Sequence, residues 1–199
     1  MQGNITEGSP GTKASIKLTW VAPINGDGIS VNGTAFFKAS TGDGSTTFST
    51  VDELVTLIDN HPLVDASLSG STITVTYYEV GEAGNEFRVT TSNYNGFQFS
   101  AAPFLSGGTD EQTESTIFTV QTGASATGNI TVKVGEVPHT VAVTAGQLPT
   151  QVAAAIAAQL TEDGVPGYSV INLPLSAIVQ FTATTPNTDI SPNLTVSID

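Results

Sequence analysis

The chain of 199 residues carries 18 acidic side chains against 5 Lys and Arg, which gives a formal net charge of −13, and it contains no cysteine. An acidic balance of this size repels nucleic-acid phosphates and anionic membranes, and the lack of cysteine excludes disulfides and thiolate metal sites. Charged residues make up only 12% of the sequence, so Ser, Thr, Asn and Gln must cover much of the surface.

Residues 1–14 are polar and glycine-rich, and they contain neither the apolar core of a signal peptide nor a transmembrane run. We expect a flexible arm here. The run SIKLTWV at residues 15–21 then alternates apolar with polar side chains, which is typical of a half-buried strand. Asn32-Gly33 predicts a hairpin, because this dipeptide tolerates the positive φ angles of a type I′ turn. The polar loop 40–47 has no hydrophobic pattern and should be exposed.

Residues 50–60 form the clearest predicted helix. Leu54 and Ile58 lie one turn apart among other apolar residues at helical spacing. Thr50 and Glu53 form a capping-box pattern at the start of the helix. A second helix is predicted over residues 148–160, where alanines surround apolar residues that recur every four positions.

Two stretches, residues 72–92 and 178–198, repeat one order: an alternating strand, a polar turn with an Asn, and another alternating strand. Gly84-Asn85 in the first copy is interpreted as a turn that sets the register of its two strands. Each half of the chain therefore runs as strand, hairpin, helix, strand and final strand pair.

This duplication predicts a strand-rich α+β fold of two tandem modules, each an antiparallel or mixed β-sheet or sandwich with one covering helix. The first module is expected over residues 15–108 and the second over 116–199. The acidic segment 109–115 is the expected linker. Its carboxylates are interpreted as solubilising charge: Asp110, Glu111 and Glu114.

No residue is assigned to a catalytic, cofactor-binding or metal site. His61 and His139 lie in no nucleophile motif. We expect His61 to cap the C-terminal end of the first helix and His139 to be a solvated or turn-associated side chain. The carboxylates are numerous enough for a glycosidase pair, but no particular pair stands out. The chain is therefore expected not to be an enzyme and to need no cofactor.

Three polar residues in glycine-rich loops, Asn25, Asp27 and Asp43, offer oxygen ligands to a calcium ion. Their spacing does not match an EF-hand. Because Asn25-Gly26-Asp27-Gly28 is also typical of a tight turn, the turn is the favoured interpretation and calcium binding the alternative.

One pattern occurs in both halves of the chain. In the first half it is the series GDGISVNGTAFF, FSTVDELVTLIDNHPLVDASLSGSTITVTY, GEAGNEFRVTTSN and LSGGTD, and in the second half it is GNITVKVGEVPHTVAVTAGQLPTQVAAAIAAQL. It resembles a β-rich module of tailed-bacteriophage virion proteins, notably Mu-like contractile tail sheaths. The resemblance covers about residues 15–199. The family offers no catalytic residues, and a complete sheath subunit is expected to carry a larger polymerising core and extended arms.

The resemblance implies a structural component of a phage virion that is assembled in the host cytoplasm. A sheath-type or tube-type tail protein would self-associate into rings or a helical polymer, together with other phage structural proteins. The alternative is a capsid or tail decoration or fibre module that binds a glycan or a protein through loops such as 40–47 and 94–99. Neither interpretation involves a membrane or direct nucleic-acid binding by charge.

Overall fold

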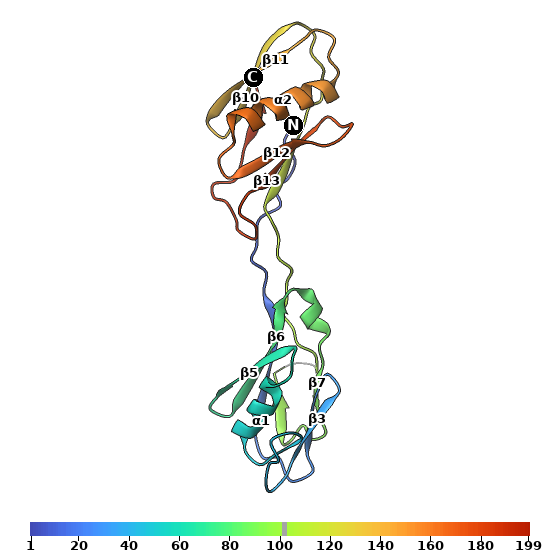
Figure 1. Cartoon of the computed structure of the whole chain (residues 1–199), viewed down its shortest axis with the longest axis vertical. Coiled ribbons are helices and arrows are strands. Elements are labelled where there is room, and N and C mark those ends of the chain that lie inside the picture. Colours follow the sequence, from blue (N-terminus) through green and yellow to red (C-terminus); the bar gives the residue numbers. More distant parts are fainter. Residues whose placement is uncertain (101–102) are drawn as a thin grey trace. The chain divides into compact units, whose positions relative to one another are not determined.

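The computed structural model describes residues 1–100 and 103–199, and these form two compact units (Figure 1). The first unit comprises Gly11–Glu111, and the second comprises Met1–Pro10 together with Gln112–Asp199. Within the described residues, 14 strands form four sheets alongside only two α-helices. The predicted strand-rich α+β class is therefore confirmed.

The N-terminal residues do not stand apart from the two units. Residues 1–10 belong to the second unit, where three isolated backbone bridges join them to the chain after residue 111: Gln2 with Phe118, Thr6 with Ser115, and Ser9 with Gln112. The expected linker 109–115 is likewise divided, since the boundary falls between Glu111 and Gln112. The second unit is thus built from two separate stretches of sequence. Residues 1–10 are polar and have no hydrophobic pattern, so the sequence did not predict their pairing with the second unit.

Two four-stranded sheets form the first unit. The first sheet has the antiparallel order β5 (Val64–Ser69), β6 (Thr72–Val80), β1 (Lys13–Trp20) and β8 (Phe97–Phe99). The second has the order β4 (Thr47–Phe48), β3 (Thr34–Lys38), β2 (Gly28–Val31) and β7 (Val89–Thr91), with β3 and β4 parallel. The predicted hairpin joins β2 to β3, and Asn32 and Gly33 have φ angles of 45° and 93°.

Helix α1 (Val51–Asp59) packs against β5 and β4 of the first unit. It begins after Thr50, whose hydroxyl accepts a hydrogen bond from the Glu53 N–H at 3.2 Å. Leu54 and Ile58 are fully buried on the face that meets the sheets. The predicted helix and its cap are confirmed.

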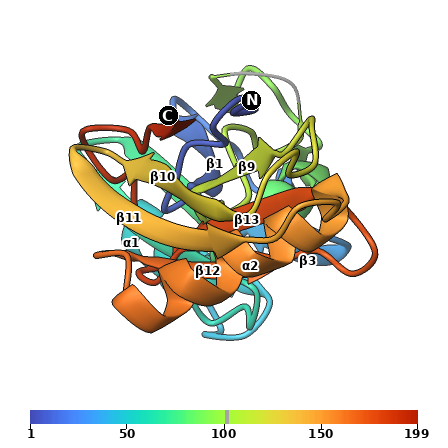
Figure 2. The same cartoon turned by 90° about the horizontal axis from the view of Figure 1, so that it is seen from above.

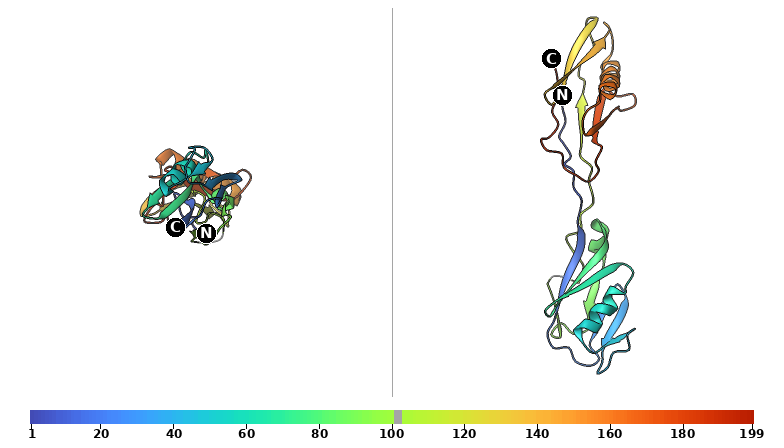
Figure 3. Two further views of the ribbon diagram at one scale, coloured as in Figure 1. Left: turned by 90° about the horizontal axis from the view of Figure 1, so that it is seen from below. Right: turned by 60° about the vertical axis from the view of Figure 1, so that its left-hand side comes forward.

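The second unit follows the same plan with fewer strands. One sheet has the order β12 (Tyr168–Asn172), β13 (Ile178–Ala183) and β9 (Ser115–Thr119). The other has the order β11 (Val137–Val143), β10 (Gly128–Val134) and β14 (Val196–Ile198). Helix α2 (Pro149–Asp163) lies against β11, β12 and β13 and buries Val152, Ile156 and Leu160 (Figure 2). Both chain termini lie in this unit (Figure 3).

The repeated strand pair of residues 72–92 is not a hairpin. β6 and β7 belong to different sheets, and the 3₁₀ helix η1 (Glu82–Glu86) connects them. Gly84 is buried, and a Cβ at this position would lie 2.8 Å from the Cβ of Ala14. Gly84-Asn85 therefore lets the chain cross closely over β1 from one sheet to the other. β13 and β14 are divided between two sheets in the same way.

Replacing Leu54 should cost the first unit more stability than removing the helix cap. Thr50→Ala removes one hydrogen bond at an exposed helix end and should lower the free energy of unfolding by about 1 kcal/mol. Leu54→Ala leaves a cavity in the core and should lower it by roughly 2 to 5 kcal/mol. Urea denaturation of the two variants measures the difference, and equal losses would contradict the packing described for α1.

Candidate functional site

Three carboxyl groups meet in the second unit: Glu7, Glu114 and Asp189. One oxygen of each lies within 4.8 Å of those of the other two. Glu7 comes from the N-terminal segment, Glu114 directly precedes β9, and Asp189 lies in the connection between β13 and β14. We call these three residues the carboxyl cluster.

Glu114 is the buried member of the carboxyl cluster, with 1% of its surface exposed. It accepts hydrogen bonds from the Tyr168 hydroxyl and, at 2.5 Å, from the backbone N–H of Ile190. Burial, followed by the hydrogen bond to Glu114, raises the pKa of Tyr168. The interpretation of Glu114 as solubilising charge was wrong: its carboxyl group holds the β13–β14 connection against β12.

Glu7 ties the N-terminal segment to that same connection. Its carboxyl group accepts a hydrogen bond from the Asn193 side-chain amide at 2.9 Å. A second hydrogen bond joins it to the carboxyl group of Asp189, and this bond raises the pKa of Glu7. Two carboxyl groups can share a hydrogen bond only while one of them is protonated. The arrangement can therefore take up and release a proton near the surface of the unit.

Asp27 and Asp43, the two acidic residues considered as calcium ligands, accept hydrogen bonds from the protein itself. Asp43 accepts hydrogen bonds from the backbone N–H groups of Thr47, Thr46 and Ser45, which hold its pKa well below its usual range. Asp27 is almost fully buried. Its carboxylate accepts a hydrogen bond from the backbone N–H of Ile24 at 2.7 Å. It accepts a second one, at 2.9 Å, from the side-chain amide of Asn93, which lies between β7 and β8 of the same unit.

The hydrogen bonds of Asp27 favour the turn interpretation of Asn25-Gly26-Asp27-Gly28, and those of Asp43 stay within its own loop. Asn25 itself is exposed. The loop 40–47 is largely exposed, as predicted, and Asp43 gives it a defined shape.

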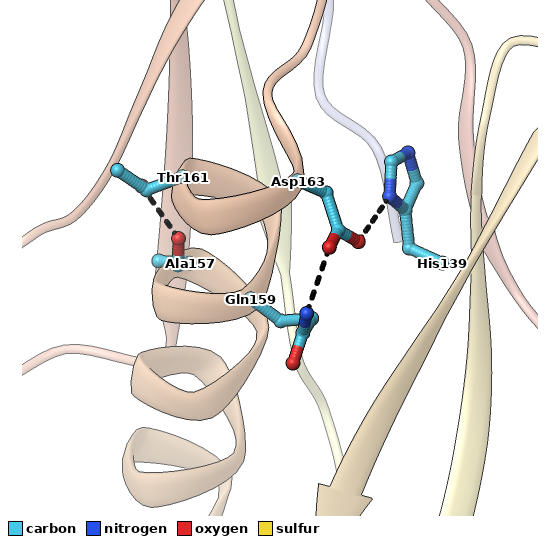
Figure 4. A network of polar contacts seen from close by, with 5 residues as sticks. All are labelled: His139, Ala157, Gln159, Thr161 and Asp163. Carbon is cyan, nitrogen blue, oxygen red and sulfur yellow. Dashed lines mark hydrogen bonds and ion pairs between the residues drawn. The ribbon is translucent and has the colours of Figure 1, made fainter.

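His139 is not solvated, contrary to expectation. It is 7% exposed, and its Nδ1 lies 2.7 Å from Asp163 Oδ2 at the end of α2 (Figure 4). The other oxygen of Asp163 accepts from the Gln159 amide at 2.8 Å. The hydrogen bond with His139 lowers the pKa of Asp163. The pair joins α2 to β11.

His61 follows the end of α1, but Asn60 is the residue that caps this helix. The imidazole lies edge-on to the ring of Phe87, with centroids 5.6 Å apart, and its Nδ1 accepts from the Leu63 N–H at 3.3 Å. Burial lowers the pKa of His61. The side chain therefore packs as a neutral ring in the first unit.

Comparisons with protein-family models, curated proteins and solved structures found no match for this chain. In the part of the chain that the structure describes, no helix is long and apolar enough to cross a membrane. Sequence reasoning missed the carboxyl cluster because Glu7 and Asp189 come from opposite ends of the chain. One sequence feature pointed to this region: Asn193 occupies the position in the second repeat that Asn85 occupies in the first, and its side chain binds Glu7.

The attachment of the N-terminal segment should weaken as pH rises. The pKa of Glu7 is raised in the folded state from an ordinary value of 4.5. Its contribution to stability is therefore complete below that value and is lost as pH rises through the folded pKa. Amide hydrogen exchange, corrected for the intrinsic rate at each pH, should show less protection of Gly3, Thr6 and Ser9 at about pH 7 than at about pH 4.

Glu7→Gln should remove this pH dependence, because the amide can donate to Asp189 and accept from Asn193 at every pH. Glu136→Gln is the matched control, since Glu136 is an exposed carboxylate in the β10–β11 turn of the same unit. A variant at Glu7 with the same pH profile as the control would contradict the shared proton.

Asp163→Asn should destabilise the second unit most at neutral pH. A lowered pKa in the folded state gives stability above the ordinary value of 3.8, and this stability is lost as pH falls through the folded pKa. The difference in Tm between Asp163→Asn and the parent should therefore shrink on acidification. Glu162→Gln, an exposed neighbour on the same helix, is the control, and a difference that stays constant with pH would rule out the pairing with His139.

Proposed function

We propose that the chain is a structural component of a tailed-phage virion, a tail protein of the sheath or tube type that acts by self-assembly and is not an enzyme. The repeated architecture carries this proposal. The runs that resemble the sheath module are the framework of both units: the β2–β3 hairpin, the stretch from β4 through α1 to β6, and the β10–β11 hairpin with α2.

The roles of the polar side chains support a building block. Asp43 shapes its own loop, Asp27 joins two loops, and Asn85 exchanges two hydrogen bonds with Gly108 at 2.8 and 2.9 Å. Each of these groups holds backbone in place within one unit. Side chains that fix loops in this way keep a surface constant from copy to copy, as a repeating assembly requires.

The acidic balance fits the same proposal. A net charge of −13 would keep free subunits apart in the host cytoplasm and would repel DNA that passes through a tail. Assembly would then need contacts with other copies and other phage structural proteins that outweigh this repulsion. Membranes and direct nucleic-acid binding by charge have no part in it.

Self-assembly should be visible in the purified protein. Because salt screens repulsion between exposed charges, raising the ionic strength from about 0.05 to 0.5 M should shift sedimentation from monomer towards larger species. Negative-stain electron microscopy of those species should show rings or helical polymers. A monomer at every protein and salt concentration would overturn the proposal.

One observation favours a decoration or fibre module as the second candidate. Tyr94 is 55% exposed, and its ring lies beside that of Phe99 with centroids 5.7 Å apart. Exposed aromatic faces on a fixed loop suit a sugar ring or a protein side chain. Binding on a glycan array that is lost in Tyr94→Ala but kept in Tyr78→Ala, a similarly exposed tyrosine of the same unit, would favour this candidate.

A further inference from the structure

The two units can be compared residue by residue along one of their sheets. Strands β9, β13 and β12 of the second unit are ordered as β1, β6 and β5 are in the first. Leu18 pairs with Ile73 in the first unit. Phe118 pairs with Val179 in the second, and all four side chains are buried. Because successive side chains of a strand point to opposite faces, the residues next to these buried pairs lie on the outer face of each sheet.

In the first unit this outer face is polar. The row of side chains next to the buried pair consists of Lys17, Thr74 and Ser67, from β1, β6 and β5. On the same sheet, Lys13 and Asp65 form an ion pair with a nitrogen–oxygen distance of 3.9 Å. Charged and hydroxyl side chains of this kind are typical of a surface in contact with water.

In the second unit the corresponding row ends in an isoleucine on each side. It consists of Ile117, Gln180 and Ile171, from β9, β13 and β12. Ile171 is 52% exposed and Ile117 is 37% exposed. Ile178 points to the same side, two residues before Gln180. The other outward residues of these three strands, which the structure describes completely, are Ser and Thr. We call this uncharged surface the isoleucine face.

The loop between β12 and β13 places a fully exposed leucine at the end of the isoleucine face. The φ angle of Leu175 is 56°, in the left-handed region. The Ser176 N–H donates to Leu173 O at 3.2 Å. With Pro174 as the second residue, this is the pattern of a type II turn, whose third residue is normally glycine or asparagine. A leucine at this position costs free energy.

Other positions of the described chain avoid this cost. The turn between β5 and β6, which corresponds to the β12–β13 loop, has a glycine in the left-handed region, Gly70 with a φ angle of 62°. Apart from Leu175, the non-glycine residues with a positive φ in the described ranges are Asn32 and Asn187. Asparagine tolerates this conformation much better than leucine does. Leu175 is therefore the exception among these turns.

The loop that carries Leu175 has a defined shape. The side-chain amide of Asn172 donates to Ser176 O at 3.1 Å and to Ile178 O at 2.9 Å. The Ser176 hydroxyl in turn accepts from the Ile178 N–H at 3.2 Å. A strained backbone that its surroundings hold in place is a feature of binding sites, and here it presents an apolar side chain to the outside.

We propose that the isoleucine face, together with Leu175, is a contact surface between two copies of this chain. In a two-fold contact the same surface is used on both copies, so Leu175 of each copy packs on Ile117 and Ile171 of the other. The inference rests on the self-association proposed above but not on the role in a virion. By itself such a contact gives a dimer, and rings or polymers require further contacts.

The net charge favours a second copy as the occupant. At −13, two copies repel each other over most of their surface. On the isoleucine face they can meet without bringing like charges together, and burial of isoleucine and leucine side chains supplies the attraction. A basic partner would instead require acidic residues on this face. The absence of charge here therefore matches the same surface of another copy.

Leu175→Asn separates a contact role from a structural one. Sedimentation equilibrium in about 0.5 M salt, where repulsion between the copies is screened, gives the dissociation constant of the dimer. The substitution should raise this Kd by about tenfold or more, because each contact loses two buried leucines. At a concentration where both proteins are monomeric, it should not lower the Tm, because asparagine tolerates the positive φ angle. An unchanged Kd, or a lowered Tm of the monomer, would contradict the role given to Leu175.

Ile171→Lys tests the sheet itself, and Val137→Lys is the matched control. Ile171 is 52% exposed and Val137, on β11 of the same unit, is 53% exposed. Ile171→Lys should weaken the dimer by about tenfold or more, because the contact would bury an ammonium group without a partner. Both substitutions reduce the net negative charge equally, so a general charge effect would strengthen association in both. The control should not weaken it.

Three outcomes distinguish this inference from the proposed function. Self-association that neither Leu175→Asn nor Ile171→Lys weakens would overturn the isoleucine face as the contact and leave the proposed function standing. Dimers that both substitutions weaken, without rings or polymers under any condition, would support the contact and count against the tail protein. A parent chain that is monomeric at every concentration and ionic strength would overturn both, and would point to a different protein as the occupant.

Discussion

The central strand of each unit needs partners along both edges, and the rest of the fold follows from this requirement. Ala14, Ile16 and Leu18 of β1 are buried, as is Phe118 of β9, so the backbone of these strands has little access to water. Buried N–H and C=O groups must be hydrogen-bonded, because an unpaired one costs about 1 to 3 kcal/mol. The hairpin strand β6 or β13 satisfies one edge, and a segment distant in sequence must satisfy the other.

Both units hold that distant segment with the amide of an asparagine. Asn85 binds the backbone of Gly108 in the first unit, and Asn193 binds the Glu7 carboxyl group in the second. Each asparagine lies in the connection between two sheets, so the crossing of the chain and the closure of the edge are coupled. The first unit makes this contact with neutral groups. The second uses the carboxyl group of Glu7, whose pKa is raised by the hydrogen bond with Asp189.

Sequence patterns predicted correctly those elements that depend on interactions between residues close together in the sequence. Helix α1 with its Thr50 cap and the turn at Asn32-Gly33 depend on residues within a few positions of each other, and both were predicted correctly. The separation of β6 from β7 into two sheets depends on buried Gly84 lying against Ala14, which alternation along the strands does not encode. Glu114 was misjudged for the same reason, since its burial depends on Tyr168 and Ile190.

The division of the second unit into two stretches of sequence bears on the order in which the protein forms during translation. The first unit is complete once Glu111 has left the ribosome, and it can fold while synthesis continues. Residues 1–10 are made before the first unit, yet their partners in β9 and in the connection before β14 come more than a hundred residues later. The second unit can therefore close around residues 1–10 only after the strands that follow the first unit have been made.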